Sequence, residues 1–118
     1  MFNIKVAASF SSAHNLRGYK GQCEDLHGHN WKVVVKVAAK NLCKIGMVMD
    51  FRIVKDELNK IIDKLDHKYL NNISYFKKVN PTSENIAKYI YDFLKNKITC
   101  LKSVTVWESD NCSATYHE

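Results

Sequence analysis

The sequence of 118 residues contains one proline and four glycines, too few for a flexible linker between domains. Its longest apolar block, residues 33–39, is interrupted by Lys36 and is far shorter than the ~20 residues needed to cross a bilayer. The first ten residues lack the basic start and apolar core of a signal peptide. These absences predict one cytoplasmic domain over residues 1–118, with no membrane partner.

The four cysteines form no Cys-x-x-Cys pair: they are Cys23, Cys43, Cys100 and Cys112. Without an export signal, we expect reduced thiols rather than a disulfide framework. Cys43, Cys100 and Cys112 lie within or beside apolar stretches, which predicts small core residues. Cys23 instead lies in a polar segment close to two histidines.

Positive charge is in excess, with 18 Lys+Arg against 12 Asp+Glu and a net charge of +6. The lysines are dispersed along the chain, whereas nucleic-acid binding is typical of a concentrated basic stripe. We therefore predict a solvated, lysine-rich surface and no nucleic-acid partner. A polyanionic small substrate is the alternative use of this charge.

Hydrophobic periodicity predicts four strands and two helices. Apolar residues alternate with polar or small ones over residues 4–10 and 31–39, as in half-buried strands. After Asp50, a candidate N-cap, apolar residues recur at helical spacing as far as Tyr69. A second helix is expected to begin at residues 81–84, where proline precedes hydroxyl residues and an acid. Strand patterns return over residues 101–108 and 112–117, around a turn at residues 110–111.

The resulting order is ββααββ, which indicates the α+β class. Strands adjacent in sequence are expected to pair as hairpins, giving a four-stranded antiparallel sheet with two helices on one face. A chain of this length cannot also cover the second face and the edges of that sheet. We therefore expect oligomerisation.

Three histidines form a candidate metal site. His27 and His29 are separated by one residue at the entrance of the second strand, so they project from the same face. His14 ends the preceding strand, and a hairpin would place it alongside. Three imidazoles without a fourth protein ligand are typical of catalytic zinc, which keeps one position open. Iron, nickel and copper also accept imidazole, and surface or structural histidines are the plain alternative.

Other residues carry candidate chemistry near or beyond this site. Cys23 lies four residues before His27, and a thiol near a divalent cation is partly thiolate and can act as a base. Asp66 can orient His67 as a proton donor at the end of the first helix. Glu108 lies on an apolar strand face, where a carboxylate needs partners such as the donors of an amino-pyrimidine. The alternatives are an inert cysteine, a surface helix end and an edge-strand glutamate.

Six short motifs run in order over nearly the whole chain: residues 10–14, 23–29, 49–51, 65–71, 80–85 and 106–108. Together they resemble the 6-pyruvoyltetrahydropterin synthase family, and more closely its bacterial 6-carboxy-5,6,7,8-tetrahydropterin synthase branch. The resemblance implies the tunnelling fold, in which three ββααββ chains close a barrel. Two such trimers would stack into a homohexamer with active sites at subunit interfaces. It also implies Zn²⁺ held by His14, His27 and His29.

The resemblance further implies a catalytic set and a pterin-binding set. Cys23 would act as the base, and Asp66 with His67 would form a proton-donating pair that reaches in from a neighbouring subunit. The residues that would bind the pterin are Glu108, Thr82, Ser83 and Glu84.

For the bacterial branch, the implied reaction converts 7,8-dihydroneopterin triphosphate to 6-carboxy-5,6,7,8-tetrahydropterin, acetaldehyde and triphosphate, towards queuosine. Some relatives replace the cysteine by a glutamate one position later, and these resemble enzymes that cleave the side chain to 6-hydroxymethyl-7,8-dihydropterin for folate synthesis. This chain has both Cys23 and Glu24, so Glu24 is a further candidate catalytic residue. A 6-pyruvoyl product and, from another class, a zinc-stabilised RNA-binding protein are the remaining alternatives.

Overall fold

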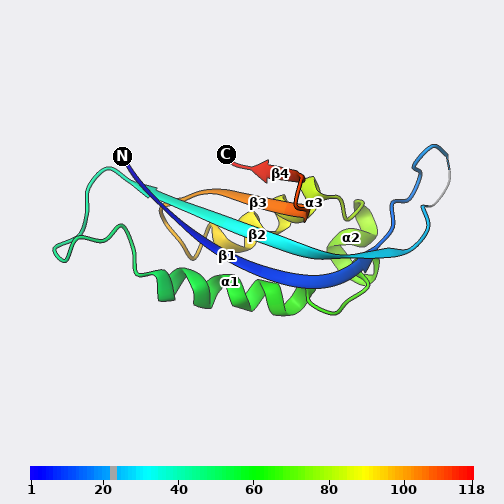
Figure 1. Cartoon of the computed structure of the whole chain (residues 1–118), viewed down its shortest axis with the longest axis horizontal. Helices are drawn as coiled ribbons and strands as arrows, with labels where there is room; N and C mark the ends of the chain where they lie inside the picture. The colour runs from blue at the N-terminus through cyan, green and yellow to red at the C-terminus, as the bar shows by residue number, and fades with distance from the viewer. Residues whose placement is uncertain (22–23) are drawn as a thin grey trace.

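The computed structural model describes residues 1–21 and 24–118. Its elements, in chain order, are β1 (Phe2–His14), β2 (His27–Ala39), α1 (Phe51–Leu65), the 3₁₀ turn η1 (Leu70–Asn72), α2 (Ser74–Lys78), α3 (Ser83–Leu94), β3 (Leu101–Ser109) and β4 (Cys112–Tyr116) (Figure 1). The predicted α+β order ββααββ is therefore confirmed. The short elements η1 and α2, between the two long helices, were not predicted.

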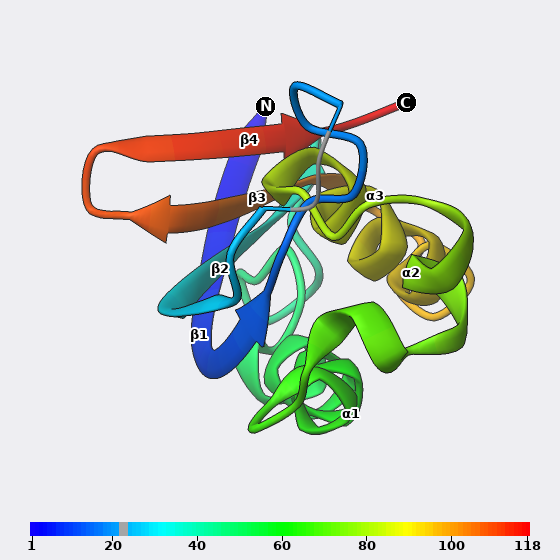
Figure 2. The same cartoon turned by 90° about the vertical axis from the view of Figure 1, so that its right-hand side faces the viewer.

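The four strands form one antiparallel sheet in the order β1-β2-β3-β4. Strands β1 and β2 pair without interruption from Phe2 opposite Ala39 to His14 opposite His27. Both predicted hairpins are confirmed, and they are joined where β2 pairs with β3. Figure 2 shows the helices gathered on one side of the curved sheet, so the described residues leave its other face uncovered.

The covered face of the sheet follows from period-two alternation. On β2, Trp31, Val33, Val35 and Val37 are fully buried, while the residues between them face the other way. Helices α1 and α3 close over this face with apolar stripes. The buried residues of the stripes are Val54, Leu58, Ile61, Ile62, Leu65, Ile86, Ala87, Ile90, Tyr91 and Leu94. His29 lies two residues before Trp31 and on the same face of β2. It is therefore just beyond the end of the core.

Helix α1 begins where the sequence predicts, with the Asp50 side chain accepting a hydrogen bond from the Arg52 amide at 2.9 Å. It ends at Leu65, earlier than the predicted Tyr69. The chain leaves the helix at Asp66 and passes through a left-handed conformation at His67, with φ of 55°. The predicted extent was wrong because residues 66–69 leave the helix for a backbone contact with another element.

That contact is with the free edge of β1. The Ser12 hydroxyl donates a hydrogen bond to the Leu65 carbonyl and accepts one from the Lys68 amide at 3.1 Å. The Ala13 amide donates to the Lys68 carbonyl at 3.0 Å, and Ala13 forms a parallel bridge with Tyr69. Residues 66–69 therefore run alongside the last residues of β1, next to His14.

The cysteines differ from the prediction. Cys43 and Cys112 are exposed, so the expectation that they are core residues was wrong. Cys43 lies in the connection after β2, and Cys112 begins the short edge strand β4, where neither is covered by a helix. Cys100 is half-buried and packs against the core as expected. Cys23 lies outside the described residues, and its predicted role stays a prediction.

Within the described residues, no helix is both long and apolar enough to span a membrane.

Candidate metal centre

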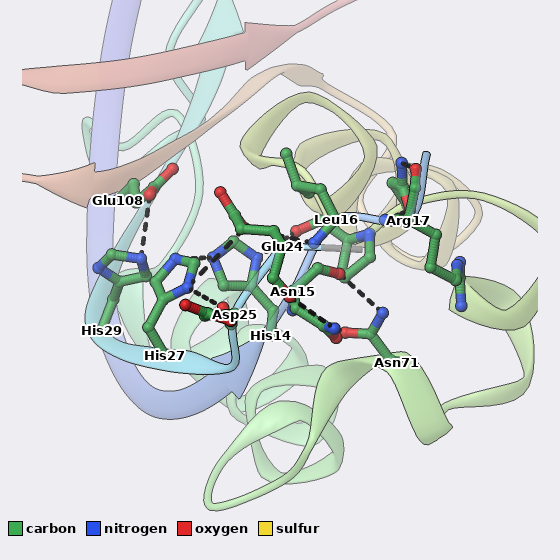
Figure 3. A network of polar contacts seen from close by, with 12 residues as sticks. His14, Asn15, Leu16, Arg17, Glu24, Asp25, His27, His29, Asn71 and Glu108 are labelled. Atoms are coloured by element: carbon green, nitrogen blue, oxygen red, sulfur yellow. Dashed lines mark hydrogen bonds and ion pairs between the residues drawn. The ribbon is translucent and has the colours of Figure 1, made fainter. Parts of the chain in front are cut away.

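The structure brings the three predicted histidines together at one end of the sheet. His14 lies directly opposite His27 in the β1–β2 register, and His29 is two residues further along the same face. One ring nitrogen from each histidine and one carboxylate oxygen of Glu108 all lie within 4.8 Å of one another. Figure 3 shows the imidazoles side by side, with Glu108 reaching His29 from β3.

Two of the rings have their tautomers set by backbone carbonyls. Nδ1 of His14 lies 2.8 Å from the Pro81 carbonyl oxygen, and Nδ1 of His27 lies 2.9 Å from that of Asp25. A carbonyl only accepts hydrogen bonds, so each Nδ1 carries the proton and each neutral ring has its lone pair on Nε2. These carbonyls are the kind of outer partner that orients a metal-binding histidine.

The two Nε2 atoms face each other. They lie 3.1 Å apart, a distance at which two lone pairs repel unless a proton or a cation lies between them. Burial is the largest influence on His14 and lowers the pKa of its ring, which favours the neutral form. A neutral His14 beside His27 is therefore an arrangement suited to binding a cation.

His29 adds a third ring nitrogen to the cluster. Its Nε2 is buried and lies 3.0 Å from Glu108 Oε1, but among the described residues nothing meets it in hydrogen-bond geometry. Three imidazole nitrogens and a carboxylate oxygen are a donor set that a divalent transition metal accepts. The residues present thus fit the metal that the sequence implies.

Trp31 supports the cluster and was not recognised from the sequence as part of the site. Its buried ring lies edge-on to His14 and His29, with centroids at 4.8 and 5.1 Å. Its indole Nε1 donates to the Ser12 carbonyl at 3.1 Å, and Phe10 stacks on its other side. The sequence signal was its position two residues after His29 on the same strand face.

A pocket of about 220 Å³ opens beside the cluster. The residues lining it come from the facing ends of β1 and β2, the connection between these strands, the start of α3, and β3: His14, Leu16, Glu24, His27, Thr82, Ser83, Glu84 and Glu108. All four residues predicted to bind a pterin therefore meet at the same cavity as two of the predicted metal ligands.

The start of α3 gives these pocket residues different local partners. The Thr82 hydroxyl accepts a hydrogen bond from the Asn85 amide at 3.1 Å and so caps the helix. Ser83 is buried, and its hydroxyl lies 3.5 Å from Glu108 Oε2. Glu84 is exposed. Glu108 is thus shared between Ser83 on one side and His29 on the other.

Glu24 is held over the pocket by an amide network. Its backbone amide donates to the Leu16 carbonyl at 2.8 Å, and its Oε1 lies 3.8 Å from Nδ1 of His27. The Asn15 side chain donates to the Glu24 carbonyl at 3.0 Å, while the buried Asn71 side chain pairs with the Asn15 backbone at 3.0 and 2.8 Å (Figure 3). Asn15 gave no signal in the sequence, and Asn71 stood only as the last residue of the 65–71 motif, because the two meet only through the fold.

Asp66 and His67 are not brought to the centre within one chain. Asp66 Oδ1 accepts a hydrogen bond from the Ser11 amide at 2.9 Å, which is the main reason that the pKa of Asp66 is lowered, and it lies 3.0 Å from His67 Nδ1. The His67 side chain is 83% exposed. The pair belongs neither to the metal cluster nor to the pocket lining, although it is assembled as the sequence predicts.

The fold and the site define an α+β protein with a cluster of three histidines that could hold a metal ion, beside a pocket lined by carboxylates and hydroxyls. The chain belongs to the 6-pyruvoyl tetrahydropterin synthase family, whose model matches residues 3–118.

Relatives and solved structures agree with this assignment. The chain is 39% identical over 122 residues to the 6-carboxy-5,6,7,8-tetrahydropterin synthase of Synechocystis sp., covering 98% of this chain and 93% of the relative. The structure of Caenorhabditis elegans 6-pyruvoyl tetrahydropterin synthase is similar with a TM-score of 0.88 and 30% identity, covering 99% and 95% of the two chains. A Plasmodium vivax 6-pyruvoyltetrahydropterin synthase, solved with a catalytic glutamate replaced by cysteine, matches with a TM-score of 0.76 and 25% identity, covering 99% and 97%.

Proposed function

We propose that this protein is a zinc-dependent 6-carboxy-5,6,7,8-tetrahydropterin synthase that acts in queuosine biosynthesis. It would convert 7,8-dihydroneopterin triphosphate to 6-carboxy-5,6,7,8-tetrahydropterin, acetaldehyde and triphosphate. The observation that carries the proposal is the convergence of His14, His27 and His29 with Glu108 beside one pocket. The name of the Synechocystis relative supports this product.

Zinc is the proposed metal because three imidazoles with a position left for substrate are its usual catalytic arrangement. When bound, zinc supplies a Lewis acid that acidifies the hydroxyls of the substrate side chain. The Pro81 and Asp25 carbonyls keep Nε2 of His14 and His27 free of protons for this purpose.

Glu108 is proposed to anchor the pterin ring. Its two carboxylate oxygens can accept hydrogen bonds from adjacent N–H donors of the amino-pyrimidine. Ser83 lies against one of these oxygens and limits how the carboxylate turns. Thr82 and Glu84 border the same cavity at the start of α3. Substrate binding would replace the contact between Glu108 and His29 that this structure contains.

Proton transfer is proposed to use two groups. Cys23 would remove a proton from the substrate side chain. Asp66 binds Nδ1 of His67, which leaves Nε2 of that ring to deliver a proton to the pterin. The exposure of His67 at the edge of β1 supports a role in the site of a neighbouring chain. The uncovered sheet face supports the same assembly, a homohexamer of two trimeric barrels.

A second candidate function rests on Glu24, whose side chain lines the pocket beside His27. A carboxylate beside a metal-binding histidine can act as a general base, and the Plasmodium vivax relative has a glutamate among its catalytic residues. Glu24 would then support cleavage of the side chain to 6-hydroxymethyl-7,8-dihydropterin, in addition to or instead of the reaction that uses Cys23.

The deciding experiment is the product profile of the zinc-loaded protein with 7,8-dihydroneopterin triphosphate, measured by mass spectrometry. We expect 6-carboxy product and acetaldehyde from the native protein, and loss of both in Cys23→Ala. The matched control is Cys43→Ala, which removes an exposed thiol. A 6-hydroxymethyl product that survives Cys23→Ala and disappears in Glu24→Ala would establish the second function.

Other outcomes would overturn the proposal. Absence of 6-carboxy product and acetaldehyde would exclude the synthase named above, and a 6-pyruvoyl product would assign the chain to the pyruvoyl activity. Tight, steeply salt-dependent RNA binding that is indifferent to Cys23→Ala and His67→Ala would instead support a non-catalytic protein.

A further inference from the structure

The sheet face opposite the helices contains a groove of about 540 Å³, whose lining residues come from all four strands. The side chains that matter for its chemistry are Lys5 of β1, Lys32 and Lys36 of β2, Thr105 and Trp107 of β3, and Thr115 of β4. Because side chains alternate along a strand, Lys32 and Lys36 point away from the core that Trp31 occupies. The groove and the metal centre therefore lie on opposite faces of the sheet.

The groove is cationic. No carboxylate lines it, and among the described residues none of its three lysines makes an ion pair. Lysines elsewhere do pair: Lys60, for example, lies 3.0 Å from Glu57. Asp110 lines an adjoining hollow at the β3–β4 turn, which shares Lys32 and Trp107 with the groove. Three lysines that form no ion pair with the described residues thus share one concave surface.

Two of these charges oppose each other directly. Lys5 and Lys36 are cross-strand partners in the β1–β2 register, and both line the groove. Like charges at directly opposite positions destabilise an antiparallel pair, and an anion between them removes that cost. The Thr105 and Thr115 hydroxyls lie 2.7 Å apart, so one donates to the other and the second keeps its hydrogen for a further acceptor.

We propose that this groove binds an oligophosphate group through Lys5, Lys32 and Lys36. Lys32 and Lys36 are four residues apart on one strand, a separation of roughly 13 Å between backbone positions. A single phosphate is too small to engage lysines at that spacing together, whereas a chain of phosphates extends along the strand. The oligophosphate is either free or the tail of a nucleotide, whose base would lie against Trp107 at the Lys32 end.

Calorimetric titration of the intact, zinc-loaded protein with tripolyphosphate tests the site. We expect saturable binding that weakens with salt, and about tenfold weaker binding in Lys5→Gln/Lys36→Gln. The matched control is Lys44→Gln/Lys55→Gln, which removes two exposed charges outside the groove and should bind as the native protein does. Equal weakening in both double variants would overturn the proposal, because it would indicate diffuse charge only.

The two tryptophans separate this groove from the metal centre. In protein labelled with 5-fluorotryptophan, tripolyphosphate should shift the ¹⁹F signal of Trp107, which lines the groove. The signal of Trp31, which lies beside His14 and His29, should stay unchanged. Binding should persist in His29→Ala. A shift of Trp31 alone, with binding lost in His29→Ala, would place the anion at the metal centre and refute the groove.

Three ligands distinguish the source of the phosphates. Inorganic phosphate should bind at least tenfold more weakly than tripolyphosphate; equal affinity would overturn the oligophosphate assignment. A nucleoside triphosphate that binds more tightly and shifts Trp107 further identifies a nucleotide, while equal affinity identifies the free chain. In thermal denaturation, Lys36→Gln should raise the midpoint of the free protein and reduce the increase caused by tripolyphosphate.

Discussion

The Nε2 atoms of His14 and His27 face each other at 3.1 Å, while Nδ1 of each ring is bound to a backbone carbonyl. Both tautomers are therefore set before any ligand arrives, which lowers the reorganisation needed to bind a metal. The buried Nε2 of His29 completes a set of three nitrogens.

Metal content should depend on His29 and not on an exposed histidine. His29→Ala removes one of three nitrogen ligands, so we expect the bound zinc to fall from one per chain to well below that after dialysis. His117→Ala alters an exposed histidine at the C-terminus and should retain the native content. Elemental analysis of both variants measures the zinc bound per chain. Equal zinc in His29→Ala would show that His29 is not a ligand.

Zinc should stabilise the fold. A ligand that binds only the native state stabilises it by about 2.7 kcal/mol at a free concentration one hundred times its Kd. We therefore expect the unfolding midpoint to fall when a chelator removes zinc and to recover when zinc is restored. His14→Asn should have the same midpoint with and without zinc. Unchanged unfolding of the native protein after complete metal removal would contradict the proposed site.

The metal-free protein should lose stability in mild acid because of His14. Burial lowers the folded-state pKa of His14 from its usual 6.5, so between these values the unfolded chain binds more protons than the native one. The contribution of His14 is fully present above pH 6.5 and is lost as the pH falls through the lowered pKa. Urea unfolding from pH 7.5 downwards measures this slope.

His14→Asn provides the control for this pH dependence. Asparagine can still donate a hydrogen bond towards the Pro81 carbonyl but does not titrate. The variant should therefore show a shallower loss of stability in the same pH window. An identical slope in both proteins would assign the effect to other groups.

Trp31 should matter for both stability and metal binding. Trp31→Ala leaves a cavity in the core and should cost about 3–5 kcal/mol in urea unfolding. Trp31→Phe keeps an aromatic ring beside His14 and His29 but loses the hydrogen bond to the Ser12 carbonyl, which is worth about 1 kcal/mol. Zinc affinity should fall more in Trp31→Ala than in Trp31→Phe. The reverse order would show that the ring does not support the histidines.

The proposed interfacial site predicts complementation between inactive variants. His29→Ala lacks a metal ligand and His67→Ala lacks the proton donor, so each alone should be inactive. If His67 serves a neighbouring chain, unfolding and refolding the two together should restore part of the activity in mixed assemblies. Mass spectrometry would confirm that mixed assemblies form. If they stay inactive, His67 and the metal ligands of one active site come from the same chain.

Much of the fold was predictable because it depends on local patterns. Alternation in β1 and β2, the caps at Asp50 and Thr82 and the helical stripes are all set by residues near each other in sequence. The end of α1 was not predictable, because residues 66–69 bind the edge of β1 through Ser12 rather than continuing the helix. The exposure of Cys43 and Cys112 likewise depends on which segments the helices leave uncovered.

By itself, the sequence determined the chemistry available: three histidines at strand ends, a glutamate on an apolar face and lysines on the opposite face of β2. Only the tertiary structure decided how these groups meet. The β1–β2 register places His14 opposite His27, the Pro81 carbonyl orients the His14 ring, and β3 brings Glu108 to His29. The physical reason is that each contact joins segments far apart in the chain, and their mutual position follows from packing of the shared core rather than from local conformational preference.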